Sequence, residues 1–240
     1  MSERVADPPS SGSGRKGIYM NISRLFAAAT IPLAVVCIFT GPAFAVAVGQ
    51  VDDFEDGTTM GWHVGLPHPV PPQNMPDGGP LGDGDNFMLI AAIGGNGPGS
   101  KLAVINDAQW AGDYTGAGVI TIEMDVNNYS ETDLYLRLLF EDPIGGPPAD
   151  AAITDAIVIP AGSGWTHASF PVTASDLTVL LGDVDTLLSN TTAIRIFHSP
   201  EPVYPPPPVI ARVGIDNIGA LGAPTATAAS TWGTVRALFR

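Results

Sequence analysis

Aromatic, cationic and acidic side chains recur along four segments of the chain in which apolar and polar residues alternate. The side chains expected to point outward from these segments are Glu123, Tyr135, Arg137, Arg195, Phe197 and Arg212. A sugar packs its C–H groups on an aromatic ring, and charged groups form strong hydrogen bonds with its hydroxyls. The set therefore predicts a carbohydrate-binding face, with glycan as the expected partner. The alternative is that residues 173–190 fold over this face, so that Tyr135 and Phe197 pack beneath them.

Catalytic motifs are absent from the sequence. The histidines, at positions 63, 68, 167 and 198, follow no zinc-ligand spacing, and there is no nucleophile elbow, P-loop or dinucleotide-binding motif. A glycosidase needs only two facing carboxylates, which the sequence leaves open. However, most Asp and Glu residues lie in Gly- and Asp-rich turns, where Asp favours the turn itself. We therefore expect no enzyme, with a glycoside-active enzyme as the third alternative.

The elements that position these side chains are β-strands. Alternation with period 2 is clear in 119–126 and 133–140 and weaker in eight further segments. These weaker segments are 51–56, 61–65, 87–93, 100–106, 152–159, 165–172, 192–198 and 210–218. Helical turns are expected only at 175–181 and 183–188, capped by Ser175 and Asp183. About ten short strands predict an all-β fold, a jelly-roll β-sandwich spanning residues 46–220.

The two ends of the chain differ from this domain. Residues 1–45 have a basic region, a short apolar stretch and an A-x-A site, the pattern of a secretory signal peptide, with Met20 as an alternative start. Residues 221–240 read as a low-complexity linker and a C-terminal tag, a flexible tail. Cleavage after Ala45 would remove the one cysteine and leave no membrane span. We therefore expect an exported protein that is extracellular, on the cell surface or in the periplasm.

Charge excludes two classes of partner. The chain has 24 acidic residues and 10 Lys and Arg residues. Residues 46–240 keep 22 of the acidic residues and six of the basic ones, which gives a formal net charge of −16. Such a surface repels nucleic acid and anionic membranes and favours cations. Long connections at 66–86, 107–118, 141–151 and 173–191 are expected at one end of the sandwich. This end could instead contact other proteins, which makes a structural or adhesive extracellular protein the second reading. The oligomeric state stays open.

Several short motifs resemble one family of domains. The run 51–58, Val-Asp-Asp-Phe-Glu-Asp-Gly-Thr, with Gly61-Trp62 after it, resembles the first strand of galactose-binding-like jelly rolls. The run 213–218, Val-Gly-Ile-Asp-Asn-Ile, resembles their last strand. Gly164-Trp165 to Phe170, followed by 192–196, resembles a passage between them. This group includes carbohydrate-binding modules and laminin domain IV-like domains of secreted bacterial proteins, of the kind found in PEP-CTERM-type sorted proteins.

The resemblance implies a structural calcium ion that joins the first strand to the last. Its ligands would be the Glu55 carboxylate, a carbonyl near Gly57 and the Asp216 carboxylate, all oxygen donors as calcium prefers. The alternative is that Glu55 and Asp216 are solvated or bonded to local amides. Taken together, the sequence predicts a secreted, non-catalytic binding or surface module.

Overall fold

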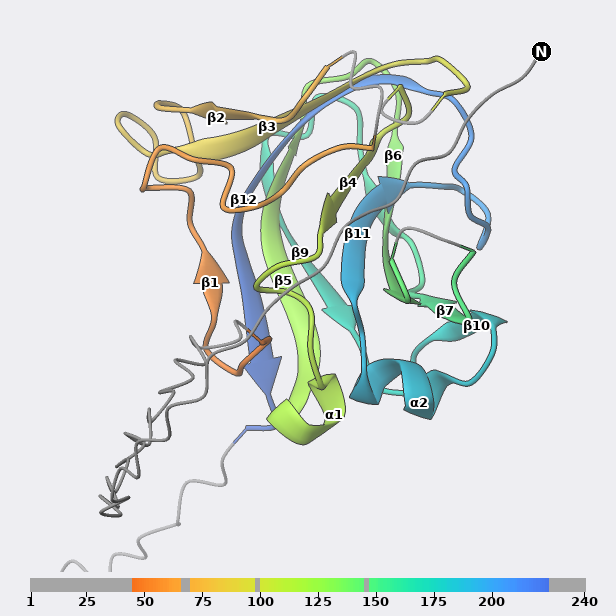
Figure 1. Cartoon of the computed structure of the whole chain (residues 1–240). Coiled ribbons are helices and arrows are strands. Elements are labelled where there is room, and N and C mark those ends of the chain that lie inside the picture. Colours follow the sequence, from red (N-terminus) through yellow and green to blue (C-terminus); the bar gives the residue numbers. More distant parts are fainter. Residues whose placement is uncertain (1–44, 66–69, 98–99, 145–146, 225–240) are drawn as a thin grey trace, which may run out of the picture. The chain divides into compact units, whose positions relative to one another are not determined.

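The computed structural model describes residues 45–65, 70–97, 100–144 and 147–224 (Figure 1). Residues 1–44 of the predicted signal peptide (1–45) and residues 225–240 of the predicted linker and tag (221–240) lie outside these residues. No helix in the described ranges is long and apolar enough to cross a membrane. The described strands form two antiparallel sheets that pack face to face, so the predicted jelly-roll β-sandwich is confirmed.

The first sheet has the order β2-β3-β12-β5-β9, with β1 also paired to β12. Its strands are β1 (Val51–Asp52), β2 (Gln73–Met75), β3 (Phe87–Ile93), β5 (Val119–Asn128), β9 (Trp165–Pro171) and β12 (Ile210–Gly222). The second sheet has the order β10-β7-β6-β11-β4, with β8 paired to β6. Its strands are β4 (Ala103–Asn106), β6 (Leu134–Asp142), β7 (Asp150–Ile153), β8 (Ile157–Ile159), β10 (Thr178–Leu181) and β11 (Ala193–His198).

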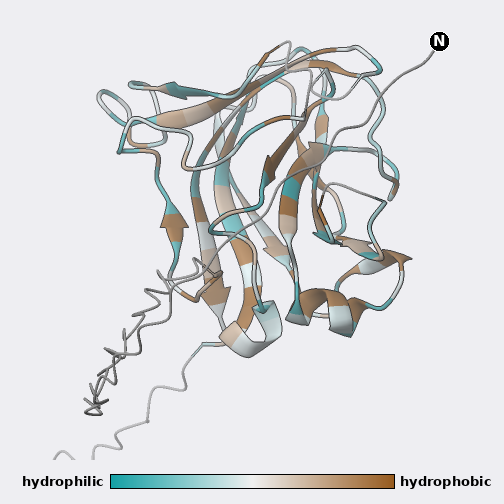
Figure 2. Cartoon of the chain, in the orientation of Figure 1, coloured by the Kyte–Doolittle hydropathy of each residue, from teal (hydrophilic) through white to brown (hydrophobic). Residues whose placement is uncertain are grey.

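The core lies between the two sheets and follows from the alternation. Along β5, Ile122, Met124 and Val126 are fully buried, while the residues between them are only half-buried. Strand β6 contributes its own alternate residues, among them Leu136 and Leu138, from the opposite sheet. Figure 2 shows this alternation as brown and teal bands along the strands. Burial of one face of each strand therefore fixes which side chains remain available outside.

Some elements of the structure differ from those predicted. The predicted strand 152–159 is interrupted between β7 and β8, and β6 pairs with both of them. The predicted helical turn at 175–181 is wrong, because 178–181 forms strand β10 against β7. The turn at 183–188 is confirmed as α2 (Val184–Ser189), and the Asp183 side chain accepts a hydrogen bond from the Thr186 N–H. Strand β2 and helix α1 (Tyr114–Ala117) have no counterpart among the predicted elements.

Candidate functional site

The outward side chains singled out in the sequence do not share one face. Glu123 lies on β5 in the first sheet, whereas Tyr135 on β6 and Phe197 on β11 belong to the second sheet. The carboxylate of Glu123 faces His167, with 3.4 Å between Oε2 and Nε2. The prediction of one continuous face is wrong, because alternation assigns a residue to a side of its strand and not to a sheet.

The proline-rich segment that follows β11 covers part of the outer face of the second sheet. Phe197 is completely buried, and the ring of Tyr204 stands edge-on against it with centroids 5.5 Å apart. The guanidinium of Arg137 is also buried and donates to the carbonyls of Thr154 at 2.8 Å and Ser199 at 2.9 Å. Neither residue can present a platform to a sugar. The alternative reading had residues 173–190 as the cover. The segment from Ser199 to Tyr204 contacts Phe197 and Arg137, and Leu180 of β10 also packs against the cluster that contains Phe197.

Arg195 and Tyr135 are the two predicted residues on this sheet that stay partly accessible. Arg195 pairs with the buried Glu141 carboxylate, and its guanidinium carbon lies 5.4 Å from the centre of the Tyr204 ring. Arg195 also lines a cavity of about 340 Å³. Tyr135 is half-buried, 6.1 Å from the ring of His198. Both cations of the predicted set on this sheet are therefore already satisfied by the protein.

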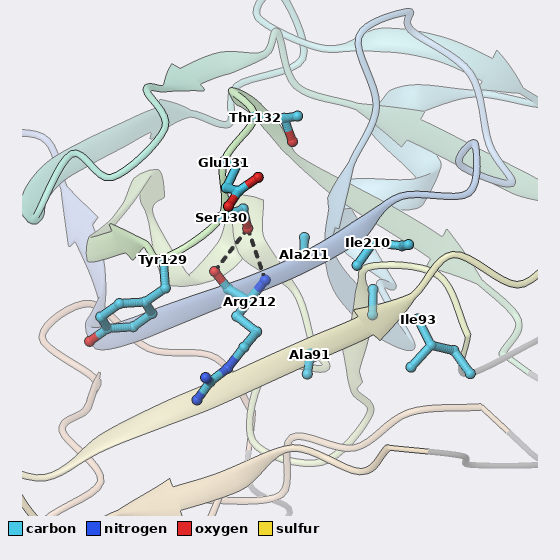
Figure 3. Close-up of a pocket in the computed structure, with 10 residues that line it drawn as sticks. Ala91, Ile93, Tyr129, Ser130, Glu131, Thr132, Ile210, Ala211 and Arg212 are labelled. Carbon is cyan, nitrogen blue, oxygen red and sulfur yellow. Dashed lines mark hydrogen bonds between the residues drawn. The ribbon is translucent and has the colours of Figure 1, made fainter.

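A larger cavity, of about 710 Å³, opens on the outer face of the first sheet (Figure 3). We call it the sheet-end cavity. It lies where β3, β12 and the loop between β5 and β6 meet. Its lining residues are Ala91, Ala92, Ile93, Tyr129, Ser130, Glu131, Thr132, Ile210, Ala211 and Arg212. It combines an aromatic ring, a guanidinium, a carboxylate and hydroxyls over an apolar floor, which is the composition of a small-ligand site.

The floor of the sheet-end cavity is built by strand register. Arg212 on β12 lies opposite Ala91 on β3, and Ile210 lies opposite Ile93. The small side chain of Ala91 leaves space beside the long side chain of Arg212. Ile210 and Ile93 are 78% and 53% exposed, so the apolar rim of the cavity is open to solvent.

A buried amide holds the loop that walls the cavity. Asn128 has no exposed surface, and its Nδ2 donates to the carbonyls of Thr132 at 2.9 Å and Ile159 at 3.0 Å. Its Oδ1 accepts from the Ser130 N–H at 2.9 Å. The Ser130 hydroxyl in turn accepts from the Arg212 N–H at 2.9 Å and donates to the Arg212 carbonyl at 3.2 Å (Figure 3). The loop is thus fixed to β12 before any ligand arrives.

Tyr129 is the aromatic group of this cavity and is 44% exposed. Its ring lies 6.4 Å from Phe87, which in turn meets Trp165 edge-on at 5.3 Å. Trp165 and Phe87 pack directly over Gly214, where a Cβ atom would come within 2.9 Å of the indole. Partial burial raises the pKa of the Tyr129 hydroxyl, against the opposing effect of the Arg212 charge. The phenol is therefore neutral at physiological pH and can donate a hydrogen bond.

Of the predicted calcium ligands, Glu55 lines an acidic cavity of about 400 Å³. Its lining includes Asp53, Glu55, Asp83, Asp85 and Asn217. The neighbouring Asp216 is 1% exposed. Burial raises the pKa of Asp216 to about 7, and nearby carboxylates add to the rise against an opposing hydrogen bond from a backbone N–H. These carboxylates belong to Asp85, Asp125 and Glu55.

Backbone strain marks the same place. Phe54 and Asn217 have φ angles of 57° and 52°, in the left-handed region that residues other than glycine rarely adopt. The carbonyls of Phe54 and Thr58, on either side of Gly57, both accept from Asn74 Nδ2, at 2.7 and 2.8 Å. The two carbonyls therefore converge on one point, which the Asn74 amide fills.

The acidic cavity offers the donor chemistry that calcium prefers, because several carboxylates line it. Yet Glu55 Oε1 accepts from the Asn86 N–H at 2.8 Å, and Asp216 Oδ1 accepts from the Asn217 N–H at 2.7 Å. Within the described residues, no group of three or more His, Cys, Asp or Glu side chains is arranged to hold a metal ion. Binding would therefore require the backbone carbonyls or a small movement of these side chains.

Sequence reasoning named Arg212 but missed Tyr129. Tyr129 lies in the turn of the run Asn127-Asn128-Tyr129-Ser130 and outside any alternating segment. An aromatic residue among turn-forming polar residues is the signal that was available. Trp62 and Trp110 are buried, whereas Trp165 is half-buried on the outer face of the first sheet.

Comparison with known proteins identifies the fold. No protein-family model matches the chain, and no curated protein matches it. Among solved structures, a family 11 carbohydrate-binding module from Clostridium thermocellum in complex with a β-1,3-1,4-mixed-linked tetrasaccharide is 17% identical. It matches over 74% of this chain and 98% of that one, with a TM-score of 0.50. A family 11 module of a cellulosomal cellulase from the same organism is 16% identical over 76% and 99%, also with a TM-score of 0.50.

A third similar structure is an exo-β-agarase. It is 15% identical over 75% of this chain but only 25% of its own, with a TM-score of 0.51. At these identities the likeness concerns the fold alone. The chain therefore has the β-sandwich fold found in carbohydrate-binding modules.

Proposed function

We propose that this chain is an exported, non-catalytic carbohydrate-binding module and that the sheet-end cavity binds the sugar. The observation that carries the proposal is the half-exposed ring of Tyr129 in the same cavity as the side chain of Arg212, whose backbone is held by Ser130. An aromatic face with adjacent charged hydrogen-bonding groups suits a pyranose ring. The shared fold with family 11 modules supports the same class of ligand.

The test is binding of soluble polysaccharides by affinity electrophoresis, with Tyr129→Ala compared against Tyr135→Ala. Tyr135 is the matched control, because it is a half-buried tyrosine on the other sheet. Loss of the stacking ring should weaken binding at least about tenfold, which corresponds to about 1.4 kcal/mol, while Tyr135→Ala leaves it unchanged. Equal loss in both variants, or in neither, would remove the sheet-end cavity from the proposal.

A calcium ion at the acidic cavity is the second part of the proposal. The buried Asp216 carboxylate lies close to three other carboxylates, and a divalent cation would relieve that repulsion. Glu55 and Asp216 would serve as ligands together with a carbonyl near Gly57. The ion would supply structural stability and takes no part in contacts at the sheet-end cavity.

An adhesive role is the competing function, and one observation favours it. Ile210 and Ile93 form an exposed apolar rim that could contact another protein. The predicted adhesive surface was the end with the long connections, whereas this rim adjoins the short loop after β5. Absence of binding to every polysaccharide, with an intact fold, would favour the adhesive function.

A further inference from the structure

We infer that the sugar bound at the sheet-end cavity carries a negative charge, a carboxylate or a sulfate, that pairs with Arg212. This inference rests on the proposed function and narrows its ligand to acidic polysaccharides. Its basis is the unpaired positive charge of the Arg212 side chain within the cavity. Figure 3 shows that side chain extending away from Ser130 and Glu131, out over the first sheet.

Four cations lie in the described residues, and they differ in what they contact. Arg137 donates to backbone carbonyls, and Arg195 pairs with Glu141. Among contacts with the described residues, the head groups of Lys101 and Arg212 make neither a hydrogen bond nor an ion pair. Of these two, Arg212 lines the sheet-end cavity. It is therefore the cation that a ligand in this cavity can reach.

The free guanidinium is not explained by a shortage of carboxylates. Acidic residues outnumber Lys and Arg by 24 to 10 in the chain, and Glu131 lines the same cavity without pairing to Arg212. The backbone of Arg212 is held by Ser130 and Tyr129, whose N–H donates to the Arg212 carbonyl at 3.0 Å. Because the backbone of Arg212 is fixed and its guanidinium is unpaired and exposed, the guanidinium is available to bind an external anion.

The geometry suits an anion attached to a sugar ring. A guanidinium binds carboxylate or sulfate oxygens through two parallel N–H groups, with greater specificity than an ammonium. Tyr129 offers a ring face for the sugar, and Ala91 opposite Arg212 leaves room for the substituent. The overall negative charge of the chain opposes a polyanion at long range. At 0.15 M salt the screening length is about 8 Å, so the contact inside the cavity dominates.

The experiment compares acidic glycans with neutral counterparts in 0.15 M NaCl by titration calorimetry. One arm uses oligogalacturonate and its methyl ester, which differ in the carboxylate charge. The other uses κ-carrageenan oligosaccharides with neutral agarose oligosaccharides for comparison, and it tests a sulfate. Arg212→Gln is compared with Lys101→Gln, the other unpaired cation. The melting temperature of each variant verifies folding, since the backbone hydrogen bonds of Arg212 do not need its side chain.

We expect the wild-type protein to bind at least one acidic glycan about tenfold more tightly than its neutral counterpart. Arg212→Gln should abolish that preference, and Lys101→Gln should keep it. The arm of the experiment that shows the preference identifies the bound group as a carboxylate or a sulfate. Equal binding of acidic and neutral forms, or a preference that survives Arg212→Gln, would overturn the inference. Binding of neutral glycans alone with dependence on Tyr129 would overturn it too, yet leave the proposed function standing. No binding of any glycan would overturn both.

Discussion

The indole nitrogen of Trp110 lies 2.7 Å from Oδ2 of Asp52, deep inside the sandwich. The same oxygen accepts a second hydrogen bond, at 2.8 Å, from the indole of Trp62. Asp52 is 2% exposed, and burial raises its pKa even though these hydrogen bonds oppose the rise. One carboxylate thus connects the two-residue strand β1 to two aromatic residues of the core.

Replacing Asp52 should therefore destabilise the fold strongly. Asp52→Ala leaves two buried indole N–H groups without an acceptor, which should cost about 2–4 kcal/mol of unfolding free energy. Asp52→Asn keeps an acceptor oxygen and should cost less. Urea unfolding measures both, with the exposed neighbour Asp53→Ala expected within about 0.5 kcal/mol of wild type. A wild-type midpoint for Asp52→Ala would contradict the role of this carboxylate.

Asp216 should make stability fall as the pH rises when divalent cations are chelated. Its pKa is about 7 in the folded state and 3.8 in the unfolded chain, so between these values the folded protein holds the extra proton. Stability from the neutral carboxyl is complete below pH 3.8 and is lost as the pH rises through 7. Unfolding midpoints in EDTA between pH 5 and 8 measure the fall. Asp216→Asn should flatten it, and an unchanged slope in that variant would assign the effect to other groups.

If the acidic cavity binds calcium, the ion should reverse the loss of stability that occurs as the pH rises. A ligand that binds only the folded state adds about 2.7 kcal/mol at a concentration 100-fold above its dissociation constant. Chelation should therefore lower the melting temperature of the wild-type protein. Glu55→Ala and Asp216→Ala should remove that sensitivity, while Asp107→Ala, an exposed carboxylate paired to His63, should retain it. Identical melting curves with calcium and with EDTA would eliminate the structural ion.

Asn128 should control binding without contacting the ligand. Asn128→Ala removes the hydrogen bonds that hold the Thr132 carbonyl and the Ser130 N–H, so the wall of the sheet-end cavity loses its fixed position. We expect a loss of about 1–3 kcal/mol in stability and weaker polysaccharide binding at temperatures where the variant stays folded. Asn190→Ala, which removes an exposed amide bonded to Asp142, is the control. Full binding by folded Asn128→Ala would show that the loop needs no such support.

The fold could be predicted from the sequence because each strand carries its own signal. The alternation of Ile122, Met124 and Val126 predicts a buried strand face, and this prediction needs no information from other parts of the chain. The pairing of strands carries no such local signal. Strands β5 and β6 are joined by five residues yet lie in different sheets, which separates Glu123 from Tyr135.

The site was harder to predict for the same reason. Whether an outward aromatic residue is exposed depends on segments distant along the chain. Phe197 has the pattern of a surface residue, but Tyr204 covers it. Asp85, which is not among the predicted calcium ligands, lies close enough to Asp216 to raise its pKa. Arg212 was placed on the right face of its strand, while Tyr129 sits in a turn whose position is fixed by the buried Asn128.

The pairing of β1 with β12 has a mechanical consequence. Val51 lies opposite Gly219, and the Gly49 N–H donates to the Ala220 carbonyl at 2.8 Å, so the first and last strands meet near their outer ends. A load that pulls on both ends of the domain would break the hydrogen bonds of this antiparallel pair one at a time. A sheet resists this direction of pulling least. The sheet-end cavity adjoins the first residues of β12, 13 residues long and thus about 40 Å from end to end. Such a load would reach the sheet-end cavity only after the junction between β1 and β12 had opened.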